Sequence, residues 1–251
     1  MTAILQTRAL NKTYTTPDQS PPVIRNLDLD IERESFTVIM GNSGSGKSSL
    51  LYLLSGLDKP SSGEVFLNGQ ALSGLNETTC AKLRRDTVGF IFQDFNLIPN
   101  LSFLENILVA GYLGSQARKA VRMRAMELLD LVGIAHLAQR LPSHTSGGEQ
   151  QRCAIARALI NKPKVVLADE PTGNLNSANS SSVLDVFATL HSQGQTLIMV
   201  THDLRTACRG DRVLFMRDGQ IHDSHVFSKD AFTSLAQREA HLFQWLSERG
   251  W

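Results

Sequence analysis

The stretch FTVIMGNSGSGKSSLLYLLSGL, residues 36–57, decides the fold of this chain. Its first five residues form a short apolar run, which predicts a buried strand, and the run from Lys47 predicts a helix. Between them, GNSGSGKSS matches G-x-x-x-x-G-K-[ST], with Gly41, Gly46, Lys47 and Ser48 in the required places. Glycines let backbone N–H groups turn toward phosphate oxygens, and the helix presents its positive end. The stretch therefore predicts a nucleotide phosphate loop, with Lys47 on the β- and γ-phosphates and the Ser48 hydroxyl on Mg²⁺.

The composition is that of an ordinary globular protein with no strong charge bias. The chain has 251 residues, 42% hydrophobic and 20% charged, with a formal net charge of +1. This balance gives no basic field for nucleic acid, so we expect no nucleic-acid partner. The three widely spaced cysteines favour buried free thiols over a disulfide framework. We expect neither a signal peptide nor a membrane span, so any membrane attachment would come through a partner.

The remaining pattern predicts strands alternating with helices. Residues 15–22 (TTPDQSPP) read as a turn between two early strands, residues 61–70 (SSGEVFLNGQ) as a hairpin, and residues 87–93 (TVGFIFQ) as a strand. Two amphipathic helices are expected over residues 101–113 and 119–134, after which residues 164–170 (KVVLADE) and 196–202 (TLIMVTH) return as buried parallel strands. This order predicts an α/β core that carries a helical insert.

Polar residues stand at the ends of the two late strands. Asp169 and Glu170 close the first, where carboxylates are costly unless they meet a cation or a ligand. We expect Asp169 to hold Mg²⁺ and Glu170 to act as the general base toward water. His202 closes the second strand, where a γ-phosphate sensor would lie. His222 and His225 form H-x-x-H without further ligands, so we expect both on the surface.

A partial second phosphate loop lies in HTSGGEQQRCAIARAL, residues 144–159. Two glycines follow a serine and precede a helix expected from about Glu149, but the stretch has no lysine of its own.

Together, the phosphate loop, Gln93, SGGEQQR, VVLADEP and THD resemble the ATP-binding cassette (ABC) ATPases in order and spacing, over residues 5–224. GFIFQDFNLIPNLSFLEN and ADEPTGNLN are further similar to the bacterial group of macrolide exporters, lipoprotein-release ATPases and bacitracin-type resistance pumps. The resemblance implies an α/β fold: a phosphate-loop (RecA-like) NTPase core with an antiparallel β subdomain and an inserted α-helical subdomain. It places the ATPase domain over residues 1–226, with the core at about 1–93 and 160–226, the helical subdomain at about 94–159, and a helical tail over 227–251.

The resemblance also implies a function: an ATPase that closes as a head-to-tail homodimer around two ATP molecules. The resemblance implies that Glu170, His202 and Gln93 are catalytic. It implies that Ser48, Gln93 and Asp169 bind Mg²⁺. Tyr14 would stack on adenine, and Ser146, Gly147, Gly148 and Glu149 would touch ATP bound to the partner chain. The remaining ATP contacts are implied for Gly41, Asn42, Ser43, Gly44, Ser45, Gly46, Lys47, Ser48 and Ser49.

The expected partner is an integral membrane permease-type subunit, which would hold the chain at the cytoplasmic face of the inner membrane. It would dock near Asp94–Leu101, although this apolar segment could instead pack on its own subdomain. In the tail, Phe232, Leu235, Leu242, Phe243 and Leu246 recur at near-helical spacing. They predict a helix packed on the core or, alternatively, a membrane or partner surface.

Two residues depart from the family pattern. The family's signature motif is TSGGEQQR here, residues 145–152, and we call residues 145–148 the signature loop. Thr145 stands where this motif usually begins with leucine, which we expect to change packing beneath the loop. Asn176 stands where the family usually has aspartate, in the loop that crosses between the two ATP sites. We hypothesise that loss of this charge weakens communication between the sites or slows hydrolysis.

Two alternatives share part of this pattern. A non-transporting ABC ATPase of a cell-division-type complex would carry every motif. A small-molecule kinase would share the phosphate loop but would have no use for Ser146–Gly148 or His202.

Overall fold

The computed structural model describes residues 3–14, 21–228 and 234–251. The chain divides into two compact units, one formed by the described parts of Met1–Cys80 and Thr196–Trp251, the other by Ala81–Gln195. We call them the phosphate-loop unit and the signature unit. Most of the predicted turn at residues 15–22 lies outside the described residues, as does Phe232.

The phosphate-loop unit contains an antiparallel sheet in the order β2-β1-β4-β5 and four mixed strands in the order β10-β9-β3-β8. β3 runs parallel to both β8 and β9, and β10 is antiparallel to β9. The antiparallel strands are β1 (Ala3–Lys12), β2 (Ile24–Glu32), β4 (Ser62–Leu67) and β5 (Gln70–Ala71). The mixed strands are β3 (Phe36–Met40), β8 (Thr196–Val200), β9 (Arg212–Arg217) and β10 (Gln220–Val226), and the helices are α1 (Lys47–Ser55), α7 (Leu204–Ala207) and α8 (Leu235–Ser247).

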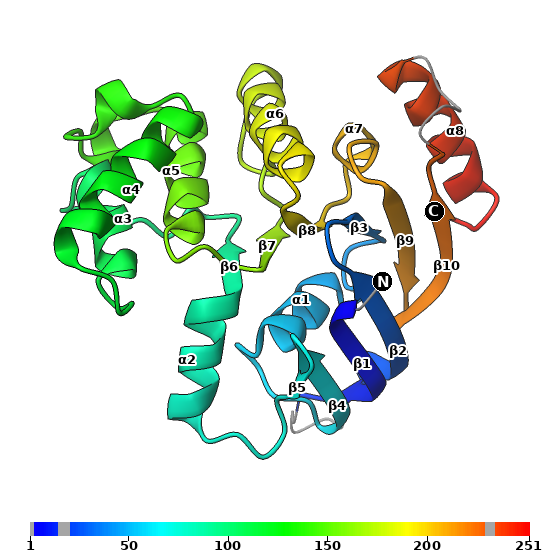
Figure 1. Cartoon of the computed structure of the whole chain (residues 1–251). Helices are drawn as coiled ribbons and strands as arrows, with labels where there is room; N and C mark the ends of the chain where they lie inside the picture. Colours follow the sequence, from blue (N-terminus) through cyan, green and yellow to red (C-terminus); the bar gives the residue numbers. More distant parts are fainter. Residues whose placement is uncertain (1–2, 15–20, 229–233) are drawn as a thin grey trace. The chain divides into compact units, whose positions relative to one another are not determined.

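The signature unit contains one parallel strand pair and a group of helices. The strands are β6 (Val88–Ile91) and β7 (Val165–Asp169). The helices are α3 (Phe103–Gly111), α4 (Arg118–Leu131), α5 (Gly147–Leu159) and α6 (Ser177–Ser192), with short 3₁₀ turns η1 (Ala135–Leu137) and η2 (Pro142–His144). Figure 1 shows α3, α4 and α5 gathered together in green. α2 (Glu77–Thr87) leads from one unit into the other.

The predicted buried strands are confirmed. Every residue of β3, β7 and β8 is buried, as their unbroken apolar runs require of parallel strands. The predicted hairpin is β4–β5, whose turn residues Asn68 and Gly69 both have positive φ, as an Asn-Gly turn favours. The strand expected over residues 87–93 covers only Val88–Ile91, because α2 continues through Thr87.

The three cysteines are free and buried, as predicted. Burial raises the pKa of Cys153 and of Cys208 to about 12, so neither thiol forms a reactive thiolate near neutral pH. Among the described residues, no helix is long and apolar enough to cross a membrane.

The tail helix α8 packs on the phosphate-loop unit, beside β10 in Figure 1. Leu242 and Leu246 are fully buried, whereas Leu235 and Phe243 remain exposed. Arg249 pairs with Asp223 of β10 at 2.5 Å, and the Arg238 guanidinium lies 4.0 Å from the Phe227 ring centroid. Of the apolar positions in the predicted pattern, Leu242 and Leu246 therefore pack on the core, as the packed-helix alternative expects.

The surface expectation holds for His222, which is exposed, and is wrong for His225. The His225 ring is half-buried, with ring centroids of Phe227, His241 and Trp245 at 4.7, 4.9 and 5.5 Å. Burial, followed by the charges of His241, Arg249 and Arg238, lowers the pKa of His225 despite the opposing carboxylate of Asp223. Sequence spacing could not reveal this cluster, because it forms only when α8 folds against β10.

This cluster predicts acid-sensitive packing of the tail. Because the pKa of folded His225 lies below its ordinary value of 6.5, the unfolded chain takes up the proton first as the pH falls. The contribution of His225 to the free energy of unfolding is therefore present above pH 6.5 and is lost as the pH falls through the lowered pKa of the folded state. We expect His225→Phe to reduce the loss of stability between about pH 8 and about pH 5, measured by urea unfolding. The matched change at exposed His222, His222→Phe, should keep the parental pH dependence; an unchanged slope in His225→Phe would refute the assignment.

Candidate functional site

The phosphate loop follows β3 and opens α1, as the sequence predicts. Gly44 and Gly46 have φ values of 81° and 99°, a conformation that glycine adopts without steric cost. Gly46 is the N-cap of α1 and provides no side-chain hydrogen bond to the helix. The first N–H groups of α1 are therefore left without a side-chain cap, which suits an anion such as phosphate.

At Gly41 and Gly46, close packing leaves no space for a side chain. A Cβ at Gly41 would lie 2.1 Å from the Met216 carbonyl oxygen, and one at Gly46 would lie 2.6 Å from the Val23 carbonyl oxygen. The motif alone does not predict these contacts. The loop thus rests closely on β9 and on the residue before β2.

Lys47 lies over the loop that precedes it. Its Nζ donates to the carbonyl oxygens of Gly41 at 2.9 Å and Asn42 at 3.0 Å, and the side chain is buried. A point charge in this place suits the phosphates of a bound nucleotide, as the sequence predicts. Ser48 and Ser49, the next residues of α1, are both half-buried.

Tyr14 lies close to the same loop. Its hydroxyl donates to Asp58 Oδ2 at 3.0 Å and lies 3.3 Å from Ser49 Oγ. Tyr14 is 40% exposed, and Lys12 Nζ is 4.7 Å from the centroid of its ring. The exposed ring next to the phosphate loop is compatible with the predicted stacking on adenine.

His202 stands at the same sheet edge as the phosphate loop. β3 and β8 are parallel, with Ile39 paired to Val200, so their carboxyl ends lie side by side. The Thr201 N–H donates to the Ile39 carbonyl oxygen at 3.2 Å. His202 follows directly and is exposed at this edge, where ligands bind in open α/β sheets.

In the signature unit, the two adjacent carboxylates take different environments. Asp169 is the last residue of β7 and is buried, whereas Glu170 leaves the strand half-buried with φ of 42°. This left-handed conformation is costly for glutamate, by about 1–3 kcal/mol. The Gly173 N–H donates to the Glu170 carbonyl oxygen at 3.0 Å and closes the turn.

Gln93 reaches the Glu170 turn. A Cβ built on Gly173 would lie 3.0 Å from Gln93 Nε2 and 3.4 Å from Glu170 Oε2. The family resemblance assigns Gln93 to Mg²⁺ and the attacking water, and Glu170 is the expected general base. These two side chains therefore come together in this unit. The oxygens of buried Asp169 and of Gln93 are ligands that Mg²⁺ accepts.

The signature loop caps α5. The helix begins at Gly147, two residues before the predicted start, because Ser146 and Glu149 form a capping box. Glu149 Oε2 accepts from the Ser146 N–H at 2.7 Å and from the Ser146 hydroxyl at 2.8 Å. The hydrogen bond from the Ser146 backbone, followed by that from its side chain, lowers the pKa of Glu149. Thr145 donates its hydroxyl to the Pro142 carbonyl oxygen at 2.7 Å, a bond that leucine could not make.

The signature glycines lie against Leu175 and against Asn179 in the first turn of α6. A Cβ at Gly148 would lie 2.7 Å from Asn179 Cγ, and one at Gly147 would lie 3.2 Å from Leu175 Cδ2. Asn176 is the N-cap of α6, and its Oδ1 accepts from the Asn179 N–H at 2.9 Å. Asn176 therefore fixes the helix end that Gly148 touches.

The expected docking segment, Asp94–Leu101, is mainly exposed, with Ile98 44% exposed. Asn106 of α3 holds its backbone: Oδ1 accepts from the Ile98 N–H at 2.7 Å, and Nδ2 donates to the Leu101 carbonyl oxygen at 2.9 Å.

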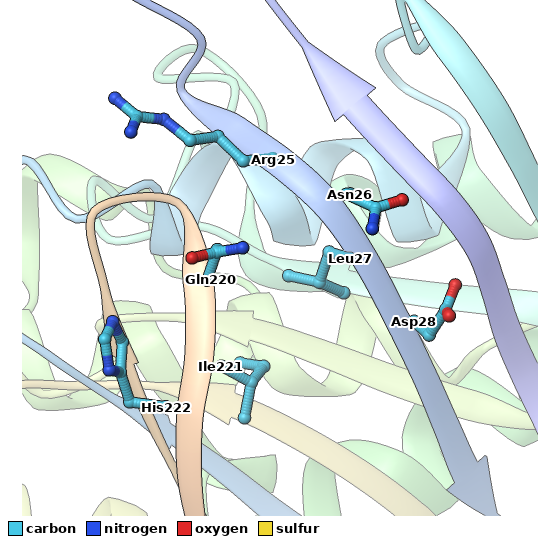
Figure 2. Close-up of a pocket in the computed structure, with 7 residues that line it drawn as sticks. All are labelled: Arg25, Asn26, Leu27, Asp28, Gln220, Ile221 and His222. Carbon is cyan, nitrogen blue, oxygen red and sulfur yellow. The ribbon is translucent and has the colours of Figure 1, made fainter.

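A cavity of about 330 Å³ lies between β2 and β10 in the phosphate-loop unit. Figure 2 shows that polar side chains of both strands line it, and its residues include none of the predicted nucleotide contacts. The lining residues are Arg25, Asn26, Leu27, Asp28, Gln220, Ile221 and His222.

Comparison with known proteins identifies the family from residues 24–173, which match the family model described as "ABC transporter". The chain belongs to the ABC transporter family. It is 42% identical over 223 residues to the lipoprotein-releasing system ATP-binding protein LolD of Xanthomonas axonopodis pv. citri (strain 306), covering 88% of this chain and 91% of that protein. The LolD protein of Xanthomonas campestris pv. campestris (strain 8004) is 42% identical over 222 residues, covering 88% of this chain and 93% of that protein.

A solved structure agrees with this assignment. The dimeric ATP-binding cassette MJ0796, in a post-hydrolysis state bound to ADP and Pi, has a TM-score of 0.83 and 36% identity. The match covers 89% of this chain and 99% of that chain. The predicted α/β fold of an ABC ATPase is thereby confirmed, and so are ATP binding and the resemblance to the lipoprotein-release group.

The cap formed by Asn176 allows its charge to be tested apart from its shape. Asparagine and aspartate are equally good N-caps, and a negative charge is favourable at a helix N-terminus. We therefore expect Asn176→Asp to leave thermal stability unchanged or slightly higher, while the ATPase rate or its cooperativity in ATP changes. Steady-state ATPase assays over a range of ATP concentrations measure both, and an enzyme with unchanged rate and cooperativity would sink the hypothesis.

Proposed function

We propose that this ABC ATPase closes as a head-to-tail homodimer around two ATP molecules and drives an integral membrane partner. The observation that carries the proposal is a difference between two helix N-termini. α1 has no side-chain cap and stands behind a loop that contains Lys47, whereas α5 stands behind Ser146 without a lysine. A phosphate at α5 would therefore take its compensating cation from a second chain, and the dimeric form of the similar cassette MJ0796 supports this arrangement.

In the proposed site, the phosphate loop of one chain binds ATP. The N–H groups at the start of α1 donate to phosphate oxygens, and Lys47 exchanges its loop carbonyls for the β- and γ-phosphates. Tyr14 holds the adenine, and Ser146–Gly148 of the second chain approach the γ-phosphate. Ser48, Gln93 and Asp169 would hold Mg²⁺, which neutralises charge on the phosphates when bound.

Hydrolysis in this proposal depends on Glu170, Gln93 and His202. Glu170 accepts a proton from the attacking water, Gln93 orients that water, and His202 donates to the γ-phosphate. The Gly173 N–H donates to the Glu170 carbonyl oxygen at 3.0 Å, and this turn fixes the backbone from which the Glu170 side chain extends. The constrained backbone of Glu170 supports a catalytic role, because such conformations cluster at active sites.

The identity to the lipoprotein-releasing ATP-binding proteins supports a membrane partner of that system over one of the cell-division type. We place the chain at the cytoplasmic face of the inner membrane, held there by this partner. The exposed Asp94–Leu101 segment is the proposed docking site. We assign residues 1–226 to the ATPase domain, with a core at about 1–93 and 160–226 and a helical subdomain at about 94–159. Residues 227–251 form the tail.

The variant Glu170→Gln tests the catalytic assignment. It keeps the size of the side chain but cannot accept the proton, so we expect hydrolysis to fall about a hundredfold or more. With Mg-ATP it should accumulate as a dimer, which size-exclusion chromatography with light scattering measures.

The matched control is Lys47→Ala in the Glu170→Gln background. Without the ammonium group the chain should lose nucleotide binding and stay monomeric under the same conditions. Brisk hydrolysis by Glu170→Gln would refute its role as the base, and a Glu170→Gln chain that binds ATP yet stays monomeric would refute the dimer.

A further inference from the structure

The segment directly after Gln93 contains a strained turn. Phe95 and Asn96 have φ values of 57° and 49°, and the Asn96 N–H donates to the Asp94 carbonyl oxygen at 2.5 Å. Positive φ is rare for a bulky residue such as Phe95 and is energetically unfavourable there. A turn of this kind persists only where surrounding contacts hold it.

Arg157 of α5 provides two of those contacts. Its guanidinium donates to the Phe95 carbonyl oxygen at 2.7 Å and to the Asn96 carbonyl oxygen. The Arg157 side chain is half-buried, and this burial lowers the pKa of its guanidinium. The planar fork of arginine can bind two neighbouring carbonyls at once, which a single ammonium matches less well.

A second element holds the same turn from the loop after β7. Asn174 Nδ2 donates to Asp94 Oδ1 at 2.9 Å and to the Gln93 carbonyl oxygen at 3.3 Å. The backbone of Gln93 is therefore fixed together with the turn that follows it.

The Phe95 ring links this turn to the signature loop. A Cβ built on Gly147 would lie 3.5 Å from Phe95 Cζ, so the ring lies beneath the first residue of α5. Arg157 and Gly147 belong to the same helix, one holding the Phe95 backbone and the other resting on its ring. The position of the ring thus connects Gln93 with the signature loop.

We propose that Arg157 and Phe95 are positioning residues that fix the signature loop relative to Gln93. The inference rests on the proposed function, in which Ser146–Gly148 meet ATP on a second chain and Gln93 orients water. Neither residue is assigned a contact with ATP. Their effect is on how well one chain presents its signature loop to the other, and on how Gln93 is placed at the same time.

Two variants separate the backbone contacts from the ring. Arg157→Gln removes the half-buried cation and its paired hydrogen bonds. Phe95→Gly keeps the carbonyl that Arg157 binds and accepts positive φ without strain, but it removes the ring beneath Gly147. If Arg157→Gln fails to fold by circular dichroism, Phe95→Gly still tests the proposal. Arg124→Gln is the control, because this arginine lies on α4 rather than on α5 and makes a 3.5 Å pair with Glu127 of its own helix.

We expect both variants to lose about tenfold in kcat, as small misplacements at a reacting centre do. The affinity of dilute chain for Mg-ATP should stay within about threefold of the parent, because the phosphate loop is intact. In the Glu170→Gln background, ATP-dependent dimers should require higher protein concentration, while Arg124→Gln matches the parent throughout. Parental kcat and dimer formation in both variants would overturn the inference and leave the proposed function standing. A parent that neither hydrolyses ATP nor dimerises would overturn both.

Discussion

A helix N-terminus exposes backbone N–H groups that need an acceptor, and the N-termini of α1 and α5 meet this requirement in different ways. At α1 the N-cap is Gly46, which offers the helix no side-chain acceptor. At α5 the N-cap is Ser146, which forms a reciprocal capping box with Glu149. The two helix ends also differ in charge. The Lys47 ammonium lies over the loop before α1, whereas the residues directly before α5, Thr145 and Ser146, are uncharged. The proposed division of each ATP site between two chains follows from this asymmetry.

Strained backbone positions lie next to the proposed catalytic groups of the signature unit. Glu170 and Phe95 both have positive φ, and Gln93, which precedes the Phe95 turn, reaches the Glu170 turn. Neither conformation is favourable by itself, so the surrounding contacts must hold each of them. Arg157 and Asn174 do so for Phe95, and the Gly173 N–H does so for Glu170.

The sequence was sufficient wherever a local pattern determines structure. The apolar runs of β3, β7 and β8, the Asn-Gly turn and the phosphate loop are all present as predicted. α2 was missed because its sequence, ETTCAKLRRDT, is polar and has no apolar stripe. The surroundings of His225 and the contacts of Arg157 with Phe95 were missed for another reason. They join residues far apart in the chain, and no local spacing records such contacts.

From the proposed division of the ATP site, we infer that one chain alone is an incomplete ATPase. The direct measurement is the ATPase rate per chain at saturating Mg-ATP across a dilution series, with the mass of the protein followed by light scattering. We predict that the rate per chain rises with protein concentration and levels off where the dimer predominates. A constant rate per chain under dilution, at concentrations where only monomer is present, would contradict it.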